Sequence, residues 1–434
     1  MCWEARCRLP VTMCLMPRRL PLDPSIAVAA NGRVDHRLIR RVNLGLVLRS
    51  LRDRGPRSRA NLAAELGITR STVSSLVSDL AGRGLVRIGN FQRGAMGRPG
   101  LDVELDGRSI CGLGAEVNVN HVATLALDLS GRVVAEHKLA LAANELPAET
   151  VIDRLSELVR DTMSELESQG VASVGVTVGI AGLVDRADDV LTCAPNLEWR
   201  DVPVGEMVRA RLGDLRVAVD NEANLAALAE ATPGDPDRQD ILVIFGEVGV
   251  GGGIVAGGRL LRGHKGYAGE FGHMIVEPGG RVCGCGRRGC WEAVCGLRAL
   301  LDLAADAGDP VRDPSVALEE RLAEINRRAD LGDPRTLAAL GEVGSWVGAG
   351  AAILTNVLNP AAIVLSGYFA NVGHHMMGAI EDKIGAGVLA ADAGGTRVEL
   401  SELGFGAAVR GGALTSLERV FDDPTCVEPR GSED

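Results

Sequence analysis

The sequence predicts an α/β chain in two parts, a winged helix-turn-helix over residues 34–105 and a larger body over residues 108–420. Three helix-like segments followed by two short strand-like segments indicate the first part. Alternating strand-like and helical runs indicate the second part. Residues 1–33, where prolines and arginines interrupt a brief apolar patch, are expected to form a disordered extension, and residues 421–434 a disordered tail.

Charge is divided unevenly between these parts. Residues 34–100 contain 13 arginines, no lysine and 4 acidic residues, so their net charge is +9. Residues 101–434 carry −23, because the whole chain has −11 and residues 1–33 have +3. This pattern is typical of a head that binds a polyanion on a body that avoids one, although a solvated basic surface is the simpler explanation of a charge run alone.

Helix signals subdivide the basic segment. Residues 37–53 carry apolar side chains near helical spacing, and Gly55 and Pro56 end that helix. Ser58 is expected to cap a second helix, which Gly67 terminates. Two helices joined by a tight turn containing glycine are typical of the helix-turn-helix, whose second helix is the next segment.

Residues 68–80 are expected to form the second helix of this motif, which is the third helix of the head. Its buried face would consist of Val73, Leu76, Val77 and Leu80, at i, i+3, i+4, i+7 spacing. Its opposite face carries short hydroxyl side chains and one guanidinium, which suit phosphates and base edges in a major groove. Strand-like residues 85–88 and 101–105 flank a basic loop, as in a wing. The sequence therefore predicts a double-stranded DNA operator as partner, with a protein-binding three-helix module as the alternative. The predicted DNA contacts are Arg59, Thr69, Arg70, Ser71, Thr72, Ser74, Ser75, Arg93 and Arg98.

Strand-like and helical runs alternate through the body. The strand-like runs are 123–127, 173–178, 217–219, 241–245, 253–255 and 363–365, and the helical runs are 148–169, 224–231 and 337–357. No run of 18 uncharged apolar residues occurs, so the sequence predicts no membrane span, and without a secretory signal it predicts a cytoplasmic location.

One histidine and three cysteines form a cluster in residues 273–290, with nine, one and four residues between them. In a reducing compartment such spacing favours a metal over disulfides, and chance cysteines in a loop are the alternative. Zinc binds four tetrahedral nitrogen and sulfur ligands, and four protein ligands leave no position for water. The sequence therefore predicts a structural Zn²⁺ held by His273, Cys283, Cys285 and Cys290.

Several motifs resemble the ROK family (repressor, open reading frame, kinase). They are Ser58-Arg59-Ala60, Ser71-Thr72-Val73-Ser74 and Gly97-Arg98-Pro99 in the head, and residues 179–185, 194–197, 221–224 and 266–292 in the body. The resemblance implies a two-lobed, actin-like (ribonuclease H-like) fold with a sugar between the lobes. The sugar contacts that it implies are Gly182, Asn196, Asn221, Glu222, Glu270, His273 and Glu292. Carboxylates and amides suit sugar hydroxyls, and zinc would hold the loop that aims Glu270 and Glu292.

Kinases of this family have two phosphate loops, and this chain departs from both. Residues 116–121 (Glu-Val-Asn-Val-Asn-His) align with Asp-x-Gly-Gly-Thr-Lys, and residues 247–253 (Glu-Val-Gly-Val-Gly-Gly-Gly) with Gly-Thr-Gly-x-Gly-Gly-Gly. Glu222 stands where the kinases have a catalytic Asp, and its extra methylene moves the oxygens by about 1.5 Å. The departures predict a sugar-sensing repressor that is not an enzyme. An ATP-dependent sugar kinase, or a bifunctional regulator-kinase, is the alternative.

Regulation is expected to depend on the angle between the lobes. A sugar in the cleft would change this angle and thereby the spacing of two heads in a homodimer or larger homo-oligomer. A helix-and-linker connection near residues 100–110 is expected to join each head to its body. The sugar could release DNA or strengthen its binding, and the sequence does not decide between the two.

Overall fold

The structure is a computed structural model that describes residues 36–89, 101–231, 235–390 and 395–430. The predicted disordered extension and the predicted wing contacts Arg93 and Arg98 lie outside the described residues.

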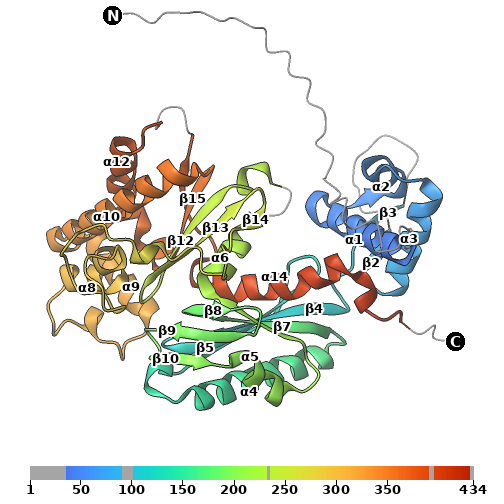
Figure 1. Ribbon diagram of the computed structural model, residues 1–434, viewed down its shortest axis with the longest axis horizontal. Helices are drawn as coiled ribbons and strands as arrows, with labels where there is room; N and C mark the ends of the chain where they lie inside the picture. Colours follow the sequence, from blue (N-terminus) through green and yellow to red (C-terminus); the bar gives the residue numbers. More distant parts are fainter. Residues whose placement is uncertain (1–35, 90–100, 232–234, 391–394, 431–434) are drawn as a thin grey trace, which may run out of the picture.

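The head is a three-helix unit with a three-stranded sheet of order β1-β3-β2 (Figure 1). Its elements are α1 (His36–Arg54), β1 (Arg57–Ser58), α2 (Arg59–Leu66), α3 (Arg70–Gly82), β2 (Val86–Gly89) and β3 (Asp102–Leu105). The predicted caps are confirmed, since the Ser58 side chain accepts a hydrogen bond from Asn61 N and Gly67 ends α2 with φ 67°. The predicted buried face of α3 is also confirmed, because its four apolar side chains are at most 1% exposed.

The first lobe is built on a five-stranded sheet of order β11-β7-β4-β5-β6. Helices α4 (Ala148–Ser168) and α5 (Val204–Leu212) lie on one side of this lobe and α14 (Ala407–Asp422) on the other (Figure 1). Its strands are β4 (Ile110–Val117), β5 (His121–Asp128), β6 (Val133–Ala140), β7 (Ala172–Ile180) and β11 (Val217–Asn221), and a small separate sheet contains β8 (Leu183–Asp185), β9 (Val190–Ala194) and β10 (Trp199–Val202).

The second lobe has a five-stranded sheet of order β14-β13-β12-β15-β16. Its strands are β12 (Ile241–Gly246), β13 (Val250–Ala256), β14 (Arg259–Leu260), β15 (Ala362–Gly367) and β16 (Arg397–Leu400). One helix, α6 (Glu222–Glu230), packs against β12 and β13. The remaining helices of this lobe are α7 (Glu292–Cys295), α8 (Leu297–Ala304), α9 (Leu318–Asp330), α10 (Pro334–Leu358), α11 (Tyr368–Val372) and α12 (Met377–Gly387).

The two large sheets repeat one topology. In each, the first strand along the chain (β4 or β12) is central, two antiparallel strands follow on one side, and two parallel strands lie on the other. Helices α6 and α14 pack against each other between the sheets (Figure 1). This duplication confirms the predicted two-lobed α/β body.

Helix α10 is, among the described residues, the one helix that is long and apolar enough to cross a membrane by length and composition. Here it belongs to the core of the second lobe, where it packs against α8, α9 and α12. Its buried side chains include Leu340, Val343 and Val347, each 0% exposed.

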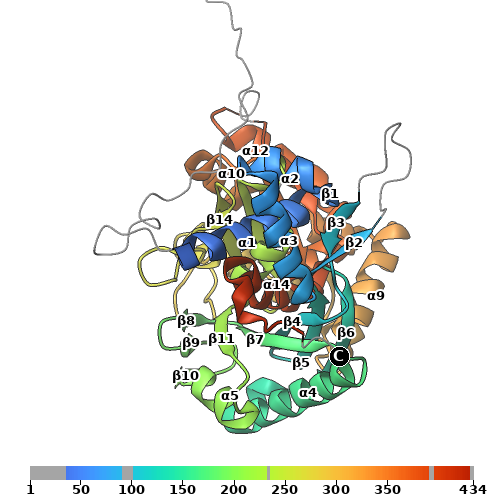
Figure 2. The ribbon, with the colours of Figure 1, turned by 90° about the vertical axis from the view of Figure 1, so that its right-hand side faces the viewer.

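The head is docked on the body, contrary to the predicted helix-and-linker connection. Only Asp106 to Ser109 separate β3 from β4, and they form a turn in which Ser109 Oγ donates to Gly84 O (2.7 Å). Helix α1 lies against α14 (Figures 1 and 2), and a Cβ built on Gly45 would lie 2.4 Å from Phe421 O. Apolar side chains of the head, β5 and α14 form one buried cluster, so no helical spacer is needed.

Arginines of α1 pair with acidic residues of α14. Arg49 Nη1 lies 2.8 Å from Glu418 Oε2, and Arg49 also pairs with Asp422. Arg52 pairs with Glu418, and its guanidinium carbon lies 4.7 Å from the Phe421 ring centroid. Part of the basic charge of the head is therefore used to attach it to the body.

The predicted disordered tail is wrong for residues 421–430. Phe421 is 3% exposed and ends the apolar face of α14. Beyond η8 (Pro424–Cys426), Arg83 Nη1 donates to Val427 O (2.6 Å), and Arg430 N donates to Gly82 O (2.8 Å). The polar composition of this segment concealed its role, because backbone carbonyls and one aromatic ring hold it against the head.

Candidate functional site

Three carboxylates meet where the two lobes face each other. Glu116 is in β4, Glu222 begins α6, and Glu247 directly follows β12. One oxygen of each lies within 4.8 Å of the others. Asn118 Nδ2 donates to Glu116 Oε1 (3.3 Å) and also to Glu247 Oε2. We call Glu116, Glu222 and Glu247 the carboxylate cluster; through Asn118 it joins the first lobe to the second.

Burial makes the carboxylate cluster retain protons. Burial raises the pKa of Glu116 to about 7, although the hydrogen bond from Asn118 acts to lower it. Burial, then the charge of Glu116, raises the pKa of Glu247 to about 8. Burial and the neighbouring Glu247 raise the pKa of Glu222 well above its usual value. Buried oxygens of Glu222 (Oε2) and Glu247 (Oε1) accept no hydrogen bond from the described residues.

A pocket of about 490 Å³ opens beside the carboxylate cluster and has walls from both lobes. Lys138 Nζ donates there to Glu319 Oε1 (2.7 Å). Burial, then Lys138, lowers the pKa of His121 to about 4, so the imidazole is neutral. In the sequence, Glu116 and Glu247 stand out only because their segments depart from the phosphate loops of the kinases. Their alignment with those loops was the signal that could have placed them in the cleft.

Asn221 and Gly182, two predicted sugar contacts, support each other. Asn221 Nδ2 donates to Gly182 O (3.0 Å), and its Oδ1 accepts from Asn224 N (3.0 Å) as the N-cap of α6. Gly182 has φ 137°, and a Cβ there would lie 2.5 Å from Cys193 O. Both polar ends of the Asn221 side chain are therefore engaged, which fixes the start of α6 next to Glu222.

The other predicted contacts gather around the β12–β13 turn. Glu292 Oε2 accepts from Val250 N (3.0 Å). A Cβ on Gly249 would lie 2.2 Å from Glu292 Oε2 and 3.4 Å from Asn196 Nδ2, so this glycine lies between the two side chains. Desolvation raises the pKa of Glu270, His273 opposes the rise and Glu292 adds to it. Asn196, Glu270, His273 and Glu292 thus form one polar group.

The predicted metal ligands converge. One ligand atom each from His273, Cys283, Cys285 and Cys290 lies within 4.8 Å of the other three. Cys283 Sγ is 3.7 Å from His273 Nδ1, and Cys285 Sγ is 3.7 Å from Cys290 Sγ. Cys295, the next cysteine along the chain, lies in α7 outside this group and is fully buried.

The loop with these ligands, residues 273–290, is called the cysteine loop here and is anchored beside Glu292. Trp291 is fully buried, and its Nε1 donates to Trp346 O of α10 (2.6 Å). Cys283 Sγ donates to Glu292 Oε1 (3.2 Å). The position of the Glu292 carboxylate therefore depends on the conformation of the cysteine loop.

Helix α3 presents most of the predicted DNA contacts to solvent. Thr69 caps α3 through Thr72 N (3.2 Å), and its hydroxyl also lies 2.9 Å from that of Ser71. The side chains of Thr69, Arg70, Ser71, Ser74 and Ser75 are exposed, whereas those of Arg59 and Thr72 are half-buried. Arg40 Nη1 donates to Ser75 Oγ (3.3 Å), so a basic residue of α1, absent from the predicted set, also borders this surface.

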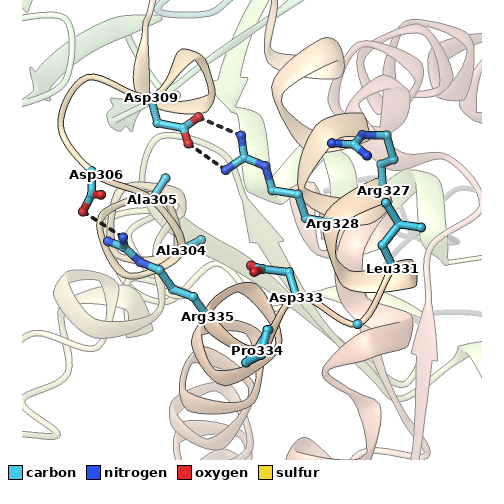
Figure 3. A pocket seen from close by; sticks show the side chains of 11 residues that line it. Ala304, Ala305, Asp306, Asp309, Arg327, Arg328, Leu331, Asp333, Pro334 and Arg335 are labelled. Carbon is cyan, nitrogen blue, oxygen red and sulfur yellow. Dashed lines mark hydrogen bonds and ion pairs between the residues drawn. The ribbon is translucent and has the colours of Figure 1, made fainter.

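A second hollow of about 570 Å³ lies where the ends of α8 and α9 meet the start of α10 (Figure 3). Its arginines are paired: Arg328 with Asp309 (2.7 and 2.9 Å) and Arg335 with Asp306 (2.7 Å). Arg327 pairs with Glu324 (2.7 and 2.8 Å). Two of these ion pairs connect α9 and α10 to the segment that follows α8, and together the three pairs leave no unpaired arginine among the described lining residues for an anionic ligand.

Comparison with known proteins identifies both parts. The family model described as ROK family matches residues 113–418, and that of the IclR helix-turn-helix domain matches residues 43–88. The xylose repressor of Bacillus subtilis strain 168 is 30% identical over 335 residues, covering 76% of this chain and 83% of the relative.

Solved structures agree in fold. A ROK family transcriptional regulator, homologous to the E. coli MLC protein, superimposes with TM-score 0.73 at 24% identity over 88% of this chain and 97% of its own. A ROK family glucokinase from Streptomyces griseus, in complex with glucose and AMPPNP, superimposes with TM-score 0.62 at 30% identity, covering 71% and 99%.

Proposed function

The chain belongs to the ROK family, and from this premise we propose that it is a sugar-responsive repressor, whose affinity for operator DNA changes when a sugar binds between its lobes. The observation that carries the proposal is the joining, through α1 and α14, of the exposed α3 surface to the cleft between the lobes, where the proposed sugar-contact residues gather. A DNA partner also makes the cytoplasm the compartment of function.

An ATP-dependent sugar kinase is the second candidate, favoured by the likeness to a glucokinase with bound glucose and AMPPNP. The carboxylate cluster argues against it. Glu116 and Glu247 lie in the two segments that align with phosphate loops, and in those segments Asn118 and Glu247 stand at positions of glycines whose backbone N–H groups would approach a phosphate. A triphosphate needs donors there, so we propose that the chain has no kinase activity.

Zn²⁺ suits the cysteine loop. Tetrahedral zinc with Zn–S bonds of about 2.3 Å separates its sulfur ligands by about 3.8 Å, close to the 3.7 Å between Cys285 and Cys290. His273, Cys283, Cys285 and Cys290 would hold the ion, and bound zinc would supply a structural crosslink. With Nδ1 of His273 facing Cys283, its Nε2 remains for a sugar hydroxyl.

Helix α14 is the proposed route from sugar to DNA. A Cβ on Gly411 would lie 1.8 Å from Leu225 O, so α14 and α6 are in backbone contact. The N-terminus of α6 carries Asn221 and Glu222, and the C-terminal half of α14 carries Glu418 and Asp422, which hold α1. A shift of α6 on sugar binding would therefore move α14 and the head with it.

DNA recognition would require two heads at a fixed separation. Half-sites on one face of DNA repeat with the helical turn, so a small rotation of each head changes the fit of both. We propose a homodimer, or a larger homo-oligomer, as the active form.

The test is a titration of the full-length protein with its own promoter DNA, followed by fluorescence anisotropy, in the presence of D-xylose, D-glucose or N-acetyl-D-glucosamine. The expected result is a change in operator affinity with one of the sugars and no phosphate transfer from ATP to any of them. Glu270→Gln should weaken the response to the sugar and leave operator affinity without sugar unchanged. Indifference of DNA binding to every sugar of a broader panel, or rapid ATP turnover, would contradict the proposal.

A further inference from the structure

Three metal-ligating side chains meet in the second lobe, and none belongs to the cleft or the cysteine loop. Asp330 ends α9, while His374 and His375 lie in η6 (Gly373–His375), between α11 and α12. One ligand atom of each lies within 4.8 Å of the other two. The Asp330 side chain is 67% exposed and that of His375 is 15% exposed, so the group is accessible from solvent on one side.

His375 has a nitrogen without a hydrogen-bond partner. Its Nε2 is buried and lies 3.3 Å from Asp330 Oδ1, yet makes no hydrogen bond with any described residue. The His374 ring lies alongside, with its centroid 3.9 Å from that of His375. A buried polar nitrogen without a hydrogen bond is unfavourable, which points to a ligand that this nitrogen and the Asp330 carboxylate would share.

The backbone holds these side chains in place. Val372 and Met376, on either side of η6, are fully buried, and a Cβ on Gly373 would lie 2.5 Å from Leu400 Cδ2. Asn326 Nδ2 of α9 donates to Asn371 O (3.1 Å), which connects the two elements one turn before Asp330. The ligand atoms therefore come from rigid elements, as a preorganised site requires.

We propose that Asp330, His374 and His375 bind a divalent first-row transition metal of the Zn²⁺, Co²⁺ or Ni²⁺ type. Two imidazoles with one carboxylate favour these ions over Mg²⁺ and Ca²⁺, which prefer oxygen ligands. At metal–ligand distances of about 2.1 Å, neighbouring ligands are about 3.0–3.4 Å apart, and the 3.3 Å between His375 and Asp330 already fits. Three protein ligands leave positions for water, unlike the four ligands of the cysteine loop.

The site would connect α9 to the junction of α11 and α12. Because the bound ion would favour the folded lobe by mass action, metal should stabilise the chain beyond the contribution of the cysteine loop.

The experiment uses the full chain without a polyhistidine tag, stripped with a chelator and dialysed against Co²⁺ or Zn²⁺. Wild type is compared with His374→Ala/His375→Ala, with Asp330→Asn, and with His264→Ala, which removes an exposed histidine elsewhere. Metal per chain is measured by elemental analysis, and the Co²⁺ absorption spectrum distinguishes thiolate from imidazole ligands. Cys285→Ser removes one ligand of the cysteine loop, so the two sites are read independently.

In wild type we expect one metal equivalent whose spectrum lacks thiolate charge-transfer bands. Cys285→Ser and His264→Ala should both retain this equivalent. In Asp330→Asn its Kd should rise at least tenfold, and in the double histidine variant it should be lost. Equal metal content in wild type and both site variants would overturn the proposal, as would a thiolate spectrum for every bound equivalent. Since Asp330 is exposed, Asp330→Asn tests the site even if the double variant does not fold.

Discussion

Asn118, directly after β4, donates a hydrogen bond across the cleft to Glu247, directly after β12. Both side chains are more than nine-tenths buried. This bond connects the two lobes through the Glu247 carboxyl group, whose pKa is raised above its ordinary value. Contact between the lobes therefore depends on pH.

Stability should fall as pH rises through the neutral range. The pKa values of Glu116 (about 7) and Glu247 (about 8) in the folded chain exceed their ordinary values, so their contribution is fully present below about pH 4.5 and is lost as pH rises through 7 to 8. Each proton involved changes the free energy of unfolding by about 1.4 kcal/mol per pH unit. Urea unfolding at pH 6 to 9 should show a decline on the order of 4 kcal/mol. In Glu247→Gln, which keeps an acceptor for Asn118, a curve as steep as that of wild type would contradict the assignment.

Gly411→Ala should uncouple sugar from DNA. The added methyl group meets Leu225 O of α6, so α14 must move, at a cost of about 1–3 kcal/mol in unfolding free energy. Sugar affinity and DNA affinity measured separately should persist, while the effect of one on the other falls several-fold. The matched control is Gly341→Ala in α10, where an added Cβ meets nothing within 4 Å.

Arg70→Ala should weaken operator binding by about 1–3 kcal/mol without altering sugar affinity. Arg70 is exposed at the start of α3, with no ion-pair partner among the described residues, and is available to phosphate or a base edge. Anisotropy titrations at several salt concentrations measure the effect. Arg298→Ala, which removes a side chain 92% exposed in the second lobe, is the control and should bind as wild type does.

Cys285→Ser should lower both metal content and sugar affinity. Loss of one of the proposed zinc ligands would release the loop that positions Glu292, so sugar binding should weaken about tenfold or more. Calorimetry with the effective sugar, before and after chelator treatment of wild type, gives the same comparison without mutation. Unchanged sugar affinity in the metal-free protein would show that the cleft does not depend on the loop.

Periodicity and caps in the sequence were sufficient for the helices of the head and for nine strands and helices of the body. Ser58, Gly67 and the apolar face of α3 act locally, so their signals survive in the sequence. The spacing of His273 and the three cysteines likewise identified a group that the structure brings together.

Contacts between distant segments were not predictable in this way. The carboxylate cluster joins residues 116, 222 and 247, and no local pattern shows that they meet. The same holds for α1 on α14, where Arg49 finds Glu418 from 369 positions away. A polar composition at residues 421–430 predicted disorder because it does not reveal acceptors for Arg83 or the burial of Phe421.

Docking of the last ten described residues on the head has a practical consequence for chimeric regulators. Residues 36–89 share their apolar interior with Val420 and Phe421, at the opposite end of the gene. An N-terminal fragment would expose that surface to water, and a graft that exchanges only the first hundred codons would join mismatched halves. Transplanting operator specificity between relatives therefore requires α14 to be exchanged together with the head.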